Sequence, residues 1–192
     1  MHTAGFVLAG GASSRMGRNK AFLMLGDRTL IEIVASAVRE AAGNVTIIGP
    51  PEIYSHFGFP VIPDRTEGAG PPAGPLVGIF TALSQTAVAW NLMVACDMPR
   101  VTPMLLLRIL REAEAHPGAG VILPESAAGF VEPLCAAYHK RVFPEISRAL
   151  AAGTRKVTDA LPRESIHYLR MSDEGFQNIN TPDEWRRASE PR

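Results

Sequence analysis

Residues 6–20, FVLAGGASSRMGRNK, carry an apolar strand directly into a glycine-rich loop. The three glycines of this stretch let the backbone approach a ligand closely, so that successive N–H groups can point at phosphate oxygens. Arg15 adds a positively charged planar guanidinium group, and Lys20 adds a compact ammonium charge. The loop matches neither a Walker P-loop nor the G-x-G-x-x-G dinucleotide motif. An ordinary turn with exposed basic residues is the alternative, but the coincidence of glycines, hydroxyls and cations favours a phosphate cradle.

Composition indicates one domain that spans residues 1–192. The chain is 46% hydrophobic and 20% charged, enough to bury one sizeable core. Its 19 basic and 19 acidic residues cancel, so we expect neither nucleic acid nor a membrane surface as a partner. No leader peptide and no apolar run of roughly 18 residues is visible, and we therefore expect a cytoplasmic protein. Cys96 and Cys135 lie in apolar runs and are predicted to be buried thiols.

Short apolar runs alternate with helical patterns along the chain, which predicts an α/β fold with a mostly parallel sheet and helices on both faces. Strands are predicted at residues 4–9, 45–49, 59–62, 90–96, 119–123, 131–138 and 166–170. Helices are predicted from Thr29 to Gly43 and at residues 75–86, 103–115 and 139–152, with a last helix from Thr181. Thr29 and Glu32 form a capping box, and Pro144 is expected to kink or restart the helix that contains it.

Ligands of open α/β sheets bind beyond the carboxyl ends of the strands, where three further groups of residues fall. Asp64 follows the strand at 59–62, although a turn aspartate explains it better when the residue is taken alone. A helix is predicted to begin at Gly74, Pro75 and Leu76, and a ribose or base could pack against the backbone there. A Gly-Pro pair is also common in ordinary turns. Asp97 follows a buried strand, and its carboxylate suits Mg²⁺ bound to phosphate oxygens better than it suits a simple turn.

Taken together, these residues resemble the molybdenum cofactor guanylyltransferases, the MobA family. The resemblance rests on the spacing of the loop at 8–21, Asp64, the segment 74–78, Cys96-Asp97-Met98-Pro99, Glu132-Pro133-Leu134 and Asn178-Ile179-Asn180-Thr181-Pro182, and it runs from residue 6 to about 186. The loop alone marks the wider nucleotidyltransferase superfamily. The double glycine Gly10-Gly11 and the final Asn-x-Asn-Thr-Pro favour guanine.

The resemblance implies a Rossmann-like three-layer nucleotidyltransferase fold and a reaction. GTP and molybdopterin, with or without its molybdenum, would give the guanine dinucleotide cofactor and pyrophosphate, with Mg²⁺ as cofactor. Residues of about 4–100 would bind the nucleotide and those of about 101–188 the acceptor. Molybdenum insertion proteins and molybdenum apoenzymes would be partners.

The same resemblance implies roles for particular residues. Arg15, Lys20 and Asp97 would be catalytic, and Asp97 would also hold the metal. The nucleotide-binding residues would be Leu8, Ala9, Gly10, Gly11, Lys20, Asp64, Gly74, Pro75, Leu76 and Asp97. Glu132, Arg155, Asn178 and Asn180 would meet the acceptor, although Arg155 also suits a solvated helix end and the asparagines suit a helix cap. The family's polar contact near the end of the second strand has no clear counterpart in residues 47–51.

Two other functions compete with this interpretation. The first is a related transferase, either a cytidylyltransferase for the same cofactor or a guanylyltransferase for another phosphorylated acceptor. The second is a GTP-binding chaperone of a molybdenum enzyme that has no catalytic activity. The joint presence of Arg15, Lys20 and Asp97 argues against the chaperone, because binding alone does not need a metal carboxylate.

Overall fold

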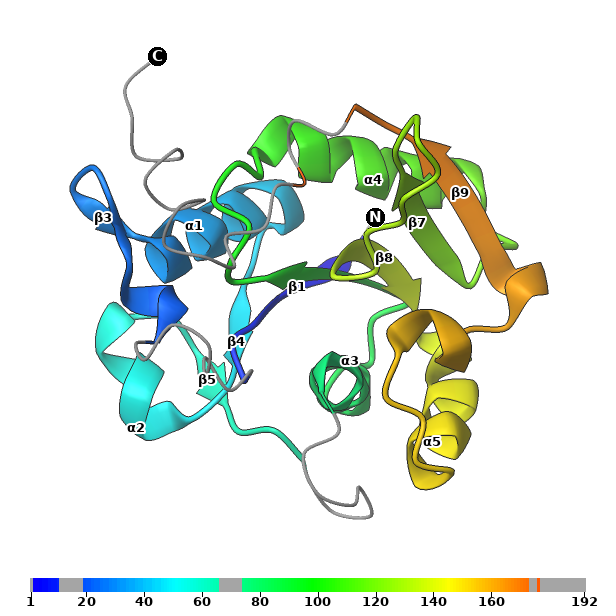
Figure 1. Ribbon diagram of the computed structural model, residues 1–192, viewed down its shortest axis with the longest axis horizontal. Coiled ribbons are helices and arrows are strands. Elements are labelled where there is room, and N and C mark those ends of the chain that lie inside the picture. The colour runs from blue at the N-terminus through cyan, green and yellow to red at the C-terminus, as the bar shows by residue number, and fades with distance from the viewer. Residues whose placement is uncertain (1, 11–18, 66–73, 173–175, 177–192) are drawn as a thin grey trace.

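A computed structural model describes residues 2–10, 19–65, 74–172 and 176. Within them, seven strands form one sheet in the order β5-β4-β1-β6-β8-β7-β9 (Figure 1). The strands are β1 (Thr3–Leu8), β4 (Thr46–Ile48), β5 (Val61–Ile62), β6 (Trp90–Ala95), β7 (Val121–Glu125), β8 (Cys135–His139) and β9 (Ile166–Arg170). Only β8 runs against its neighbours, β6 and β7, so the sheet is mostly parallel, as the alternating pattern predicts.

Helices cover both faces of the sheet, and the fold is therefore a three-layer α/β fold. The helices are α1 (Leu30–Ala42), α2 (Pro51–Tyr54), α3 (Pro75–Ser84), α4 (Pro103–Ala115) and α5 (Phe143–Ala151). In Figure 1, α1 and α4 lie together on one face, and α3 and α5 lie on the other. No described helix is long and apolar enough to cross a membrane.

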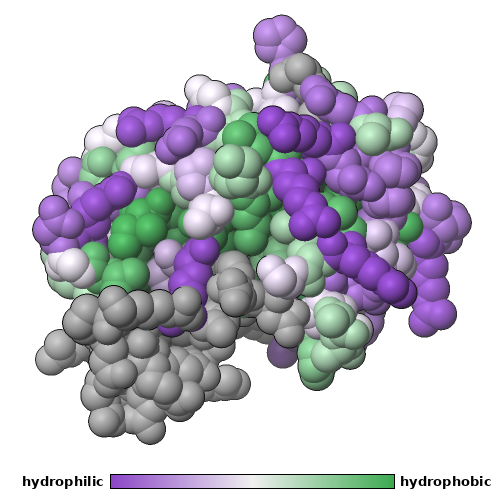
Figure 2. Space-filling view, turned by 90° about the horizontal axis from the view of Figure 1, so that it is seen from above, coloured by the Kyte–Doolittle hydropathy of each residue, from purple (hydrophilic) through white to green (hydrophobic). Residues whose placement is uncertain are grey.

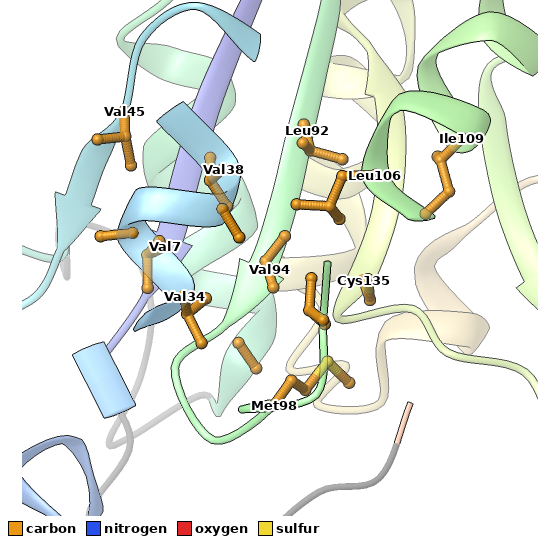
Figure 3. Close-up of a cluster of buried hydrophobic side chains, with 14 of the residues drawn as sticks. Val7, Val34, Val38, Val45, Leu92, Val94, Met98, Leu106, Ile109 and Cys135 are labelled. Atoms are coloured by element: carbon orange, nitrogen blue, oxygen red, sulfur yellow. The ribbon is translucent and has the colours of Figure 1, made fainter. Parts of the chain in front are cut away.

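The strands separate two apolar cores because their side chains alternate between the faces. Val7 of β1 and Leu92 of β6 pack toward α1 and α4, where Val34 and Leu106 meet them (Figure 3). Leu8 and Met93, one residue further along each strand, pack toward α3 and α5. The whole of β6 is buried, which agrees with its position in the middle of the sheet. The central strands β1 and β6 are therefore packed on both faces, and this packing fixes the positions of the residues that follow each strand.

Most predicted elements are confirmed, and their ends differ for local reasons. The capping box of Thr29 and Glu32 is present, and Gly43 ends α1 in the left-handed conformation. The helix predicted at 139–152 starts as a 3-10 turn and restarts at Phe143, with Pro144 in its first turn. The strand predicted at 131–138 begins only at Cys135.

The burial of one cysteine differs from the prediction, and two short elements of the structure were not predicted. Cys135 is buried, but Cys96 is only partly buried because it lies just past the end of β6. Neither the short helix α2 nor the hairpin of β2 (Met24–Leu25) and β3 (Arg28–Thr29) has a clear signal in the sequence. The helix predicted from Thr181 lies outside the described residues.

Candidate active site

The strands β1, β4, β5 and β6 are parallel, and their carboxyl ends lie side by side along one edge of the sheet (Figure 1). This edge is the one along which these four strands end, not an outermost strand. Backbone hydrogen bonds continue past the strands: the Cys96 N–H donates to the Leu8 carbonyl at 3.1 Å, and the Ala9 N–H donates to Ile48 at 2.8 Å. These bonds bring the start of the phosphate loop beside the segment that carries Asp97. Leu8 and Ala9 are buried, so the polar groups that they offer a ligand are those of the backbone.

Tyr54 ties together the two ends of the predicted phosphate loop. Its hydroxyl donates to the carbonyl oxygen of Ala9 at 3.1 Å and accepts from Nδ2 of Asn19 at 3.0 Å. Asn19 in turn accepts a hydrogen bond from the backbone of Ala21 and caps the 3-10 turn that begins at Lys20. The sequence motifs single out neither residue as part of the site. Asn19 stands next to Lys20 in the motif, whereas nothing in the sequence around Tyr54 marks it as a partner of the loop.

Removing the Tyr54 hydroxyl should loosen this arrangement. The side chain is almost fully buried, and the Tyr54→Phe variant leaves the Ala9 carbonyl without its donor. We expect the free energy of unfolding to fall by about 1–2 kcal/mol, the usual cost of an unpaired buried polar group. Chemical denaturation measures this loss, with Tyr168→Phe on the exposed part of β9 as the matched control. Equal free energies of unfolding for the two variants would show that the Tyr54 hydroxyl does not stabilise the two ends of the loop.

Asp64 lies against the backbone of the loop rather than in open solvent. A Cβ atom added at Gly10 would come within 1.9 Å of Oδ2 of Asp64, so any other residue there would have to displace this carboxylate. A Cβ at Gly78 of α3 would lie 3.8 Å from Oδ1 of the same carboxylate and 3.2 Å from Leu8. Burial raises the pKa of Asp64. The structure therefore packs this carboxylate between the first strand's loop and α3, which a turn aspartate does not require.

The contact between Gly10 and Asp64 leads to a second expected result. The Gly10→Ala variant forces the Asp64 carboxylate to move, because two atoms that are not bonded cannot stay 1.9 Å apart. We expect catalytic efficiency with a nucleotide to fall by about tenfold or more, since misplacing a binding group by 1 Å costs up to about 10²-fold. Steady-state kinetics measure it, and Gly118→Ala is the control because a Cβ there meets nothing within 4 Å. Unchanged kinetics in the Gly10 variant would refute the argument.

Lys20, Asp97 and Glu132 form a second polar group at this edge. Nζ of Lys20 lies 3.5 Å from Oδ2 of Asp97, with the two side chains 15% and 23% exposed. Burial raises the pKa of Asp97, and the Lys20 ammonium opposes that shift. Burial also raises the pKa of Glu132, and the charge of Asp97 adds to the effect. Glu132 therefore faces the same region as Asp97, from the segment that precedes β8.

The start of α3 closes another side of the region. Gly74 caps the helix with a φ of 66°, and Pro75 is its first residue. Leu76 is buried in the core, so its side chain is not available to a ligand. The carbonyl oxygen of Arg155 lies 3.8 Å from the position of a Cβ at Gly74, so the segment of Arg155 passes close to this helix start. Gly11, Arg15, Asn178 and Asn180 lie outside the described residues.

The family model of the MobA-like NTP transferase domain matches residues 5–166. The chain belongs to this family. Two relatives, each named "Probable molybdenum cofactor guanylyltransferase", come from Bacillus subtilis and Pelotomaculum thermopropionicum. The first is 35% identical to this chain, over 93% of the chain and 90% of the relative. The second is 34% identical, over 98% and 92%.

Solved structures agree with the assignment to the MobA-like family. Molybdopterin-guanine dinucleotide biosynthesis protein A from Archaeoglobus fulgidus is 28% identical to this chain, with a TM-score of 0.81 over 97% of this chain and 96% of the other. A CMP:2-keto-3-deoxy-manno-octonic acid synthetase is only 13% identical, but its TM-score of 0.79 shows the same fold. The MobA-like chain is therefore a nucleotidyltransferase with the three-layer fold that the sequence resemblance implies.

Proposed function

We propose that this protein transfers GMP from GTP to molybdopterin, which gives molybdopterin guanine dinucleotide and pyrophosphate. One observation carries the proposal: in a MobA-like chain, the two described ends of the phosphate loop, at Ala9 and at Lys20, lie beside the segment of Asp97. The names of the Bacillus subtilis and Archaeoglobus fulgidus relatives support guanine as the base and molybdopterin as the acceptor.

The reaction needs positioning and charge neutralisation rather than a protein nucleophile. The terminal phosphate of the acceptor attacks the α-phosphorus of GTP in line, and pyrophosphate leaves. Backbone N–H groups of the glycine-rich loop would hold the leaving phosphates, because glycine lets the backbone approach a ligand closely. Lys20 places a positive charge where negative charge develops on the departing oxygens. The Tyr54 hydroxyl holds the two ends of this loop, at Ala9 and Asn19, close together.

The carboxylates at this edge fit a divalent cation, and Mg²⁺ is the one we propose. Asp97 is partly exposed, and although burial raises its pKa, the Lys20 ammonium beside it opposes that shift. Asp64 presents a second carboxylate from the other side of β1. Magnesium prefers one or two carboxylates together with phosphate oxygens, which matches this donor set. When bound, the ion supplies charge neutralisation for the phosphates. Asp97 would hold it, with Asp64 as the second candidate.

The acceptor would bind on the side of Glu132 and Arg155. Both residues belong to the C-terminal half and flank the edge that carries Asp97 and the start of α3. The N-terminal half, with Lys20 and Asp64, would bind the nucleotide, and Arg15, Gly11, Asn178 and Asn180 would add contacts from both halves. The dinucleotide product would then pass to molybdenum insertion proteins and apoenzymes.

Release of pyrophosphate with different nucleotides tests this proposal. Purified protein is incubated with Mg²⁺ and GTP, CTP or ATP, with and without molybdopterin. We expect pyrophosphate only when GTP and molybdopterin are both present. Release with CTP would reassign the enzyme to the cytidylyltransferases, and tight GTP binding without release would favour a chaperone.

A further inference from the structure

A second group of metal-binding side chains lies at the opposite end of the sheet. Glu112 occupies the last turn of α4, His116 follows directly after the helix, and His167 is the second residue of β9. β9 runs parallel to β1, so its start lies away from the carboxyl ends where Lys20 and Asp97 meet. In the described part of the chain, this is the only group of three or more His, Cys, Asp or Glu residues whose ligand atoms all lie within 4.8 Å of one another.

The spacing of these atoms resembles that of ligands around one ion. Oε1 of Glu112 lies 2.8 Å from Nε2 of His167 and 3.2 Å from Nδ1 of His116. Ligands bound to zinc at about 2.0–2.1 Å in a tetrahedron stand about 3.3 Å apart. The two imidazole rings are stacked, with their centroids 3.7 Å apart. Two of the three distances are therefore within about half an ångström of the spacing around one zinc ion, and all three ligand atoms lie within 4.8 Å of one another.

The chemistry of the three ligands selects among metals. We propose that Glu112, His116 and His167 bind one Zn²⁺ ion that joins the end of α4 to the edge strand β9. Two imidazole nitrogens and one carboxylate oxygen suit zinc far better than Mg²⁺ or Ca²⁺, which take oxygen ligands. The side chains are 27–41% exposed, so water can complete the coordination and the ion can enter from solvent. Hydrophilic residues cover much of the face that α1 and α4 present in Figure 2.

A purely structural role for the three residues predicts a different behaviour. Without a metal, Oε1 of Glu112 hydrogen-bonds with Nε2 of His167, and Nδ1 of His116 hydrogen-bonds with the Glu112 carbonyl oxygen at 3.1 Å. Zinc would replace the protons of these contacts, because a ligating imidazole nitrogen must be unprotonated. The hydrogen-bonded arrangement stabilises the protein whether or not zinc is present, whereas the metal site stabilises it only when zinc is added.

Titration of the metal-free protein with Zn²⁺, followed by calorimetry, tests the site directly. We expect one ion per chain, with the same affinity in the wild type and in Asp97→Asn, and a rise in Tm on zinc addition. The His167→Gln variant keeps a hydrogen-bonding group but should bind zinc more than about 100-fold more weakly, since even outer-shell changes cost about 10–100-fold. His56→Gln, which changes a histidine outside the group, is the matched control.

A spectroscopic measurement makes the result independent of folding differences. Co²⁺ in place of zinc should give visible absorption bands of a low-coordinate site in the wild type and in His56→Gln, and not in His167→Gln or Glu112→Gln. Circular dichroism checks that these variants are folded. Zinc affinity that is unchanged in His167→Gln, or no binding at micromolar zinc in the wild type, would overturn the proposal.

Discussion

The Asp97→Asn variant should lose GMP transfer almost completely while it remains folded. Asparagine keeps the size of the side chain but removes the charge that would hold the cation and that pairs with Lys20 at 3.5 Å. Removing one electrostatic stabiliser lowers kcat by about 10²–10³-fold, and loss of a metal ligand should reach the upper end of that range or exceed it. Steady-state turnover of GTP with molybdopterin measures the effect.

The stability of the same variant serves as its control. Burial raises the pKa of Asp97, so the folded protein holds the proton of this carboxyl more tightly than the unfolded chain does. Ionisation at neutral pH therefore costs stability, and this cost disappears as the pH falls below the unfolded pKa. Asparagine never ionises, and we expect the Tm of Asp97→Asn at pH 7 to equal or exceed that of the wild type. Wild-type turnover in a folded Asp97→Asn variant would remove Asp97 from the mechanism.

Replacing Lys20 with alanine should produce the second large loss. The ammonium is the cation that the described part of the structure brings to Asp97, and we propose that it stabilises the leaving pyrophosphate. We expect kcat/KM for GTP to fall by about 10²–10³-fold. Stability should fall as well, because the mostly buried Asp97 carboxylate loses its positively charged neighbour, so the folded fraction is measured alongside turnover. Arginine at this position should restore part of the activity, since it keeps the charge but not the shape.

The pH profile of the Lys20→Ala variant offers an independent check. The Lys20 charge lowers the pKa of Asp97 against the effect of burial, so its removal should raise that pKa further. The acid limb of the activity profile should then move to higher pH. Arg148→Ala is the matched loss of a positive charge, because Arg148 lies exposed on α5 and pairs with Glu145. Equal losses in both variants would mean that Lys20 acts only through net charge.

The sequence predicts the central part of this fold because local signals and burial agree there. The buried run of β6 and the capping box of α1 are both strong, short-range patterns, and both are confirmed. The antiparallel direction of β8 is not encoded by such a pattern, because strand direction depends on the connections and on the pairing of distant residues. The short hairpin of β2 and β3 has only two residues in each strand, too few for any periodicity.

The candidate site divides in the same way. The sequence motifs single out Gly10, Lys20, Asp64 and Asp97. The structure brings these residues to one edge because the strands before them, β1, β5 and β6, are parallel and belong to the same half of the sheet. Tyr54 could not be predicted, since its role depends on a hydrogen bond to Ala9, 45 residues away in the chain. The group around His167 combines a helix end with an edge strand, which no local motif describes.

Transfer of label from GTP to the acceptor tests the central claim most directly. GTP labelled on its α-phosphate, with γ-labelled GTP in parallel, is incubated with the purified protein, Mg²⁺ and molybdopterin, and the pterin products are separated. We expect the α-label in a pterin guanine dinucleotide and the γ-label in pyrophosphate, with neither product from Asp97→Asn. If α-label never enters a pterin product while molybdopterin and GTP are intact and available, the assignment as a guanylyltransferase is wrong.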